Sequence, residues 1–252
     1  MRQFYVTLHS PFRLFEMFFW PFVDVVLWGF LTVYLRSLSP ELAKPAAFLL
    51  GALLLWDIMF RGKLAIAISF LEESWNRNVL NVLATPLTPG EYLVGATTFG
   101  FVKVGLGWVA IAMVAWLAYS FDVTSLGISL LPFAASLAMT ALVLGLMTLV
   151  LILWLGKGAE VLAWGLAFLL MPISAVFYPV AVLPRPLALA AKFWAASYIF
   201  EGMREVLSSG TVRWDWITIS FGLNLGYLVA MLVAAKLSLE AFARKGFISR
   251  YL

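Results

Sequence analysis

The sequence predicts an all-α membrane protein with six transmembrane helices. Of its 252 residues, 63% are hydrophobic and only 12% are charged, and the mean hydropathy is +0.99. A soluble domain is about 45–50% apolar and about 25% charged, and a compact sphere of this size has no room to hide so many apolar side chains. Several apolar runs also reach the length of about 20 residues that crosses a bilayer. Soluble enzymes, DNA-binding modules and disordered tails are therefore excluded.

The six candidate spans have no internal repeat and no linker between them, so residues 1–252 are expected to form one transmembrane domain. In chain order the spans are residues 18–35, 46–70, 92–119, 128–155, 160–183 and 215–238. The first run is too long for a cleaved signal peptide and is not followed by small cleavage-site residues. Residues 4–15 mix aromatic residues with His9 and Arg13, which suits an N-terminal interfacial helix or an extension of the first span.

The positive charges give the predicted orientation. An even number of spans puts both termini on the same side of the membrane. Ten Lys and Arg residues, Lys63 among them, fall on that side, against six on the other side. Because positive residues favour the cytoplasmic side, both termini are expected in the cytoplasm. The membrane topology therefore explains the net charge of +4. We expect the chain to contact membrane lipid and not nucleic acid.

The residue inventory limits the chemistry of the chain. Cysteine is absent and His9 is the only histidine, so disulfide, thiolate-metal, haem and cysteine-nucleophile sites lack their residues. The segment 156–158 lacks the pattern of a phosphate-binding loop, and the aspartates are scattered. We therefore expect no enzyme activity and no cofactor or metal bound by this chain.

Residues 71–83, between the second and third spans, predict a short amphipathic helix on the cytoplasmic surface. Its two faces carry apolar residues (Leu71, Trp75, Val79, Val82 and Leu83) and polar residues (Glu72, Glu73, Asn76, Arg77 and Asn81). Pro86 ends this helix, and residues 88–91 have the cap, proline and glutamate of a new helix start. The pattern leaves two interpretations open: a solvated connector, or a helix that docks onto a partner protein.

Three charged residues are predicted inside the bilayer. Asp57 and Arg61 stand four residues apart in the second span, and Lys103 lies in the third. All three are about 15–21 Å from the cytoplasmic ends of their helices, where an unpaired charge costs about 3 kcal/mol. We expect Lys103 to reach Asp57, in a cluster that either lines a pathway or fixes the helix hairpin. Asp24 and Asn224 are interpreted as isolated packing positions in the first and last spans.

The segment after the fifth span predicts two short re-entrant helices. Prolines at positions 172, 179, 184 and 186 interrupt it, and residues 187–207 are apolar but too few for two more crossings. Short helices that enter the outer leaflet and return are tolerated where protein or water covers the backbone. Glu201 and Arg204, three residues apart, form either a charged lid or part of a solvated face.

Three segments, in order, resemble the permeases of ABC-2 type transporters. Residues Glu72-Glu73-Ser-Trp-Asn-Arg77 through Thr85-Pro86-Leu-Thr-Pro89-Gly-Glu91 resemble the hallmark segment of that family. Residues Phe177-Tyr178-Pro179-Val-Ala-Val-Leu183-Pro184 resemble its Tyr-Pro-x-x-x-Leu-Pro signature. Tyr198-Ile-Phe-Glu201-Gly-Met-Arg204 resembles a third motif, although Ala196-Ser197 replaces the usual proline before the tyrosine. The likeness covers nearly the whole chain.

The resemblance implies roles for the residues in these motifs. The ATPase-coupling helix would contain Glu72, Glu73, Trp75, Asn76, Arg77, Asn78 and Leu83, and the turn after it Thr85, Pro86, Pro89 and Glu91. The outer re-entrant gate would contain Tyr178, Pro179, Leu183, Pro184, Tyr198, Glu201 and Arg204.

The resemblance also implies the function: the permease subunit of an ATP-driven exporter in the bacterial plasma membrane, dimeric with a second copy or a paralogue. Two copies of a separate cytoplasmic ATPase, which would hold ATP and Mg, would drive it. A glycan, a lipid-linked molecule, a drug or a peptide all remain open as substrate. The alternatives are an ion-coupled secondary transporter using Asp57, Arg61 and Lys103, and a membrane scaffold or intramembrane enzyme.

Overall fold

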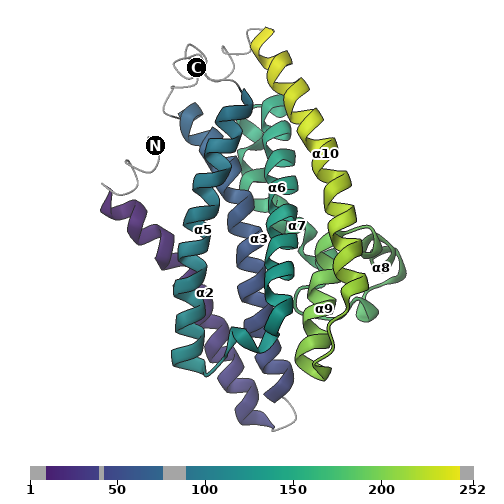
Figure 1. The fold of residues 1–252 in the computed structure, drawn as a ribbon. Helices are drawn as coiled ribbons and strands as arrows, with labels where there is room; N and C mark the ends of the chain where they lie inside the picture. The colour runs from purple at the N-terminus through teal and green to yellow at the C-terminus, as the bar shows by residue number, and fades with distance from the viewer. Residues whose placement is uncertain (1–9, 40–42, 76–88, 245–252) are drawn as a thin grey trace.

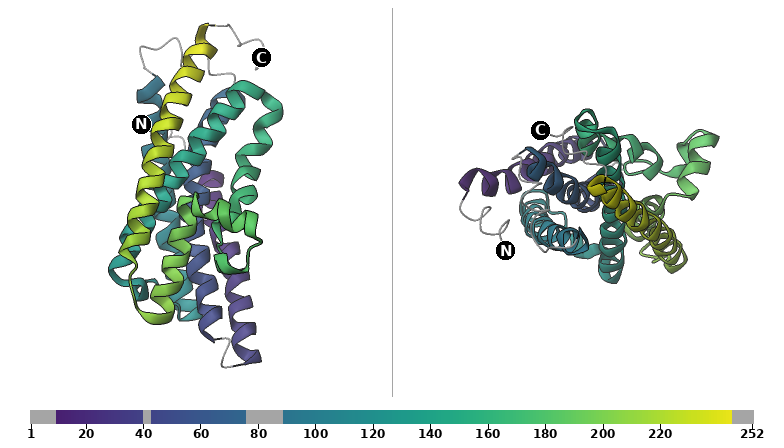
Figure 2. Two further views of the ribbon diagram at one scale, coloured as in Figure 1. Left: turned by 90° about the vertical axis from the view of Figure 1, so that its right-hand side faces the viewer. Right: turned by 90° about the horizontal axis from the view of Figure 1, so that it is seen from above.

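The computed structural model describes residues 10–39, 43–75 and 89–244, which form helices joined by short turns and contain no strand (Figure 1). The α-helices are α2 (Pro11–Leu38), α3 (Ala43–Trp75), α5 (Pro89–Tyr119), α6 (Leu130–Leu155), α7 (Val161–Ser174), α8 (Arg185–Lys192), α9 (Ala195–Ser209) and α10 (Trp214–Arg244). Short 3-10 helices are η2 (Val123–Ser129), η3 (Lys157–Glu160) and η4 (Val180–Val182). The long helices run along one bundle axis, and α8 lies at the edge of the bundle, between its two ends (Figure 2).

Several of these helices are suited to a membrane. Within the described residues, 4 stretches are long and apolar enough to cross one: Leu14–Leu38, Thr97–Tyr119, Val123–Leu155 and Trp214–Ala241. Helix α3, with 33 residues, is also long enough to cross a membrane. It is less apolar than these four stretches, because Asp57, Arg61 and Lys63 lie in its middle. The protein is therefore an all-helical protein with multi-pass transmembrane character.

Of the two arrangements predicted for the N-terminal segment, the described residues show the extension of the first span. Residues 11–17 are not a separate interfacial helix but the first turns of α2, which continues to Leu38. Ser10 is the N-cap and Pro11 occupies the first helical position, where its fixed φ favours a helix start. Pro21 lies inside this helix. Residues 4–9 of the predicted interfacial helix lie outside the described part of the chain.

The predicted fifth span, residues 160–183, is wrong at its C-terminal end, because α7 stops at Ser174 after only 14 residues. Pro172 lies in the last turn, where it lacks an N–H donor. Ala175 then takes a left-handed conformation with φ 52°, which ends the helix. The apolar composition of residues 175–183 concealed this break.

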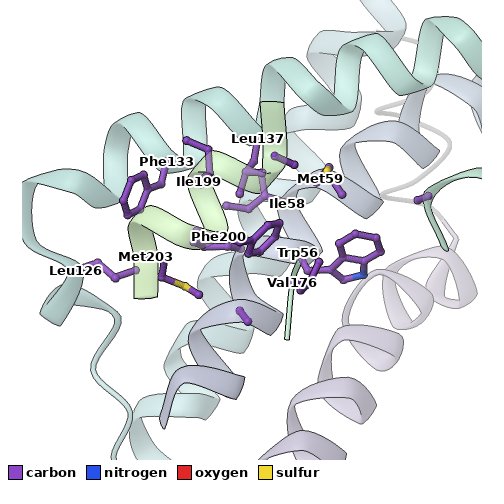
Figure 3. Packing of buried hydrophobic residues seen from close by; sticks show 14 of the residues in the cluster. Trp56, Ile58, Met59, Leu126, Phe133, Leu137, Val176, Ile199, Phe200 and Met203 are labelled. Atoms are coloured by element: carbon purple, nitrogen blue, oxygen red, sulfur yellow. The ribbon is translucent and has the colours of Figure 1, made fainter. Parts of the chain in front are cut away.

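Helix α6 is the centre of the bundle and packs against α3 and α10. It is apolar on all sides, and its buried residues occupy several faces, as expected for an enclosed helix. A single buried cluster joins it to α3 and α9 (Figure 3); the cluster includes Trp56, Met59, Phe133, Leu137, Ile199, Phe200 and Met203. Helix α9 is therefore anchored in the same core as the long helices.

Two glycines allow α3 to approach its neighbours closely. A Cβ at Gly100 of α5 would lie 2.3 Å from the Cβ of Ala65, and one at Gly145 of α6 would lie 2.7 Å from Ile66 Cδ1. Any larger residue would push the helices apart, which is the usual reason for small residues at membrane helix contacts. Helix α3 is thus held tightly between α5 and α6.

Candidate functional site

The chain between α7 and α9 is the least regular part of the bundle. Helix α7 rises about 20 Å over its length, whereas the hydrocarbon core is about 30 Å thick. The chain therefore leaves the long helix at residue 175, within the thickness of the bundle, and only the short η4 and α8 interrupt the irregular stretch before α9. Backbone groups in such a place must be satisfied by protein or water, and the partners of these groups define the candidate site.

Arg204 of α9 satisfies the carbonyl groups at the end of α7. Its Nη2 donates to the carbonyl oxygens of Ala175 and Val176, the second at 3.2 Å. Its guanidinium also lies 4.6 Å from the centre of the Phe48 ring of α3, a favourable cation–π position. One side chain thus joins α9, the end of α7 and α3.

Glu201, one turn earlier on α9, binds the same stretch of backbone. Its Oε1 accepts a hydrogen bond from Val180 N at 2.5 Å and lies 3.2 Å from Arg204 Nη1. We call Glu201, Arg204 and residues 175–180 the clasp. The side chains of the pair are partly buried rather than fully solvated, and the charged lid stays a prediction.

Three tyrosines satisfy further carbonyl groups around the clasp. The hydroxyl of Tyr178 donates to Pro172 O at 3.1 Å, and that of Tyr198 donates to Lys192 O at 2.8 Å. Tyr227 of α10, which sequence analysis did not single out, donates to Phe193 O. The broken backbone is therefore held by side chains from α9, α10 and the loop itself.

The remaining predicted gate residues shape the loop. Pro179 and Leu183 flank η4, and Pro184 precedes α8. Next to them, the rings of Phe177 and Trp28 stack with centroids 4.4 Å apart and an interplanar angle of 16°. The loop that contains the predicted signature thus contacts α2 as well as α9.

A second site lies between α2 and α3. The Nε of Arg61 donates to Asp57 Oδ1, and its Nη2 lies 3.2 Å from Asp24 Oδ2. The side chain of Asp57 is almost fully buried, whereas that of Asp24 is 50% exposed. One guanidinium therefore bridges two carboxylates, and we call these three residues the charged triad.

Lys103 does not take the place expected for it. Among the residues that the structure describes, no ion pair joins it to Asp57; the second carboxylate on Arg61 comes from Asp24. Arg61 already holds Asp57 Oδ1, because the two stand one turn apart on α3. Asp24, interpreted from the sequence as isolated, is thus a member of the site.

Lys63 is fully buried inside α3 rather than located in a cytoplasmic flank. Its Nζ has no hydrogen-bond partner within the described ranges and lies 5.8 Å from the centre of the Phe60 ring. A buried ammonium without an acceptor is costly. Its place four residues after Met59 and three before Ile66, both buried, is the signal by which the sequence could have indicated this burial.

The predicted coupling helix is only partly described. Glu72, Glu73 and Trp75 form the last turn of α3, in continuous helix with the second predicted span. Asn76, Arg77, Asn78, Leu83, Thr85 and Pro86 lie outside the described residues. Pro89 begins α5, and Glu91 lies in its first turn.

A neutral polar network joins α6 to α10. The hydroxyls of Ser136 and Ser220 are 2.7 Å apart, Asn224 Nδ2 donates to Ser136 O at 2.9 Å, and Thr140 donates to Asn224 Oδ1 at 3.0 Å. Ser220 also donates to Ala195 O at the start of α9, at 2.8 Å. The four-residue spacing on both helices is the signal by which the sequence could have indicated this network.

The chain matches no protein-family model and no curated protein. Among the described residues, no group of three or more His, Asp or Glu side chains is arranged to hold a metal ion. The interpretation of the site therefore depends on its own geometry and on the sequence motifs.

Proposed function

We propose that the chain is the membrane-spanning permease subunit of an ABC-2 type exporter. It moves a substrate such as a glycan, a lipid-linked molecule or a drug out of the bacterial cytoplasm, as a dimer with a second copy or a paralogue. Two copies of a separate ATPase, which bind ATP and Mg, supply the energy, and this chain catalyses no reaction. In this proposal α7 and the returning α8 and α9 count together as the fifth of six crossings, and both termini are cytoplasmic.

The observation that carries the proposal is the meeting of two motifs in the clasp. Two separate segments of the sequence each resemble this family: residues 177–184 and residues 198–204. In the structure Glu201 and Arg204 bind residues 175–180 directly. The bond between Val180 and Glu201 joins the two segments directly, and this contact supports the proposal.

Co-purification with an ATPase tests the proposal. We expect the chain, extracted from its native membrane, to bring down an ATPase whose ATP hydrolysis depends on the complex. Glu73→Ala with Arg77→Ala should lose both association and hydrolysis, since these residues belong to the proposed coupling helix. Lys236→Gln, an exposed change on α10, is the control that should retain both. Unchanged association in the double variant would refute the docking role.

A second candidate function is an ion-coupled transporter, and the charged triad favours it. Two carboxylates share one arginine, and Asp57 Oδ2 has no hydrogen-bond partner among the described residues. Such a site has the chemistry to take up a proton. The two functions separate in membrane vesicles: transport that stops on collapse of the proton gradient but continues without ATP supports the ion-coupled transporter.

A further inference from the structure

Helix α8 carries two positive charges in a region without acidic residues. Between Glu160 and Glu201 the sequence contains no Asp or Glu, but it contains Arg185 and Lys192, the first and last residues of α8. Both side chains are exposed. Within the described part of the chain, neither takes part in an ion pair. No carboxylate among the described residues therefore compensates the positive charge of α8.

The C-terminal end of α8 lies at the level of the middle of a membrane-crossing helix. Phe193, the residue after Lys192, accepts a hydrogen bond from Tyr227 through its carbonyl oxygen, and Tyr227 lies near the middle of α10. The nearest edge of a hydrocarbon core centred there is about 15 Å away. A lysine side chain cannot span that distance by extending along the helix surface.

The outward side of α8 is also amphiphilic. Ala191 is buried against the bundle, whereas Leu189 is 57% and Phe193 68% exposed. Arg185, Leu189 and Lys192 recur at helical spacing and so share the outward side. Apolar side chains between two cations match a molecule that has an acidic group attached to an apolar part.

We propose that α8 presents a water-accessible cationic surface within the thickness of the membrane, and that its ligand is the acidic group of an amphiphilic anion. Hydrocarbon cannot solvate Lys192 at this depth, so water must reach the C-terminal end of α8. The identification of this anion with the transported substrate rests on the proposed function. The hydration of the surface does not depend on that function.

Quenching of a single label tests the surface without an ATPase or a known substrate. Because the chain has no cysteine, Leu189→Cys can carry the only fluorophore of a protein reconstituted in phosphatidylcholine nanodiscs. Iodide is the anionic quencher, acrylamide the neutral one and a doxyl-labelled phospholipid the lipid one. Ser208→Cys, on the exposed end of α9, is the aqueous control. Val229→Cys, two residues from Tyr227 and exposed on α10, is the control at matched depth.

We expect iodide to quench the label at position 189 and not the label at position 229. Arg185→Gln with Lys192→Gln should lower the iodide quenching constant about threefold, because the local excess of anions is lost, and should leave acrylamide quenching unchanged. Lys236→Gln should have no effect. If the double variant does not fold, as judged by circular dichroism and size-exclusion chromatography, Lys192→Gln alone makes the same comparison with a smaller effect.

Three results would overturn the proposal. Quenching at position 189 by doxyl lipid and not by iodide would show that α8 faces hydrocarbon. Stronger quenching by brominated phosphatidylglycerol than by brominated phosphatidylcholine, without iodide quenching, would show that anionic lipid and not water covers α8. A disulfide-linked dimer through position 189, without iodide quenching, would show that a second copy covers α8. None of these results depends on co-purification of an ATPase.

Discussion

The charged triad and the neutral network are both buried polar sites between helices, but they differ in how completely their atoms are paired. In the network, Ser136, Thr140, Ser220 and Asn224 all have partners at 2.7–3.1 Å. In the triad, one arginine serves two carboxylates, and Asp57 Oδ2 has no hydrogen-bond partner among the described residues. A fully paired network fixes one arrangement, whereas an incompletely paired charge leaves a second arrangement available. We therefore expect the triad to fix the arrangement of its helices less strictly than the neutral network does.

Of the substitutions that test this difference, removal of Arg61 should change the stability of the protein most. Arg61→Met leaves the buried carboxylate of Asp57 without a counter-charge, which costs about 3–5 kcal/mol of unfolding free energy. The measurement is unfolding by sodium dodecyl sulfate in mixed micelles, followed by circular dichroism. Arg61→Met combined with Asp57→Asn removes both buried charges and should recover most of the loss. Equal stability of Arg61→Met and wild type would show that the triad contributes no pairing energy.

Lys63 extends the comparison to a buried charge without any described partner. Lys63→Met keeps the length of the side chain and removes the ammonium, so it should stabilise the protein by about 1–3 kcal/mol. The same unfolding assay measures this gain. Lys236→Met, on the exposed side of α10, is the control and should change stability by less than about 0.5 kcal/mol. A loss of stability in Lys63→Met would mean that the amine has an acceptor outside the described residues or in a partner.

The neutral network should give a smaller loss than the triad. Asn224→Leu removes one of the two acceptors of the Thr140 hydroxyl and one of the two donors to Ser136 O, and leaves the bond between these two groups. The expected cost is about 1–2 kcal/mol. Leu225→Ala, at a neighbouring exposed position, controls for the change of side-chain volume. A double-mutant cycle with Ser136→Ala measures the coupling between the two helices. Additive effects in that cycle would contradict a shared network.

The sequence predicted the parts of this fold that depend on local composition and spacing. Long apolar runs gave α3, α5, α6 and α10 to within a few residues at most ends, because the length of a membrane helix is visible in hydropathy. The end of α7 was not predicted, since residues 175–183 stay apolar after the helix has stopped. Pro172 gave the only local indication of that break.

In the candidate sites too, the contacts within one helix could be predicted from the sequence, and the contacts between elements could not. The spacing of Asp57 with Arg61, and of Glu201 with Arg204, brought those pairs together because each lies within one turn of a helix. Asp24 and the carbonyl groups of Ala175 and Val176 come from other elements, and no local pattern relates them to Arg61 or Arg204. Lys63 was predicted wrongly, because a positive residue near the end of a predicted span usually lies in the flanking segment outside the hydrocarbon.

The smallest effect is expected at Asp122, a charged residue outside the membrane-crossing helices. It is the titratable site with which the pH dependence of the neutral network is compared. Its Oδ1 accepts hydrogen bonds from the hydroxyl and the backbone N–H of Thr124, at 2.7 and 2.8 Å, and these bonds lower the pKa of the carboxyl. Since the folded pKa lies below the unfolded value of about 3.9, the contribution is present above that value and lost as the pH falls through the folded pKa.

The thermal midpoint of wild type should therefore exceed that of Asp122→Asn at pH 7 by slightly more than at pH 3. Thr124→Val, which removes one of the two hydrogen bonds, should lie between them. The difference between wild type and Asn224→Leu should instead be the same at both pH values, because the neutral network contains no titratable group. If the Asn224→Leu difference changes with pH and the Asp122→Asn difference does not, the distinction between a neutral, fully paired site and a charged one fails.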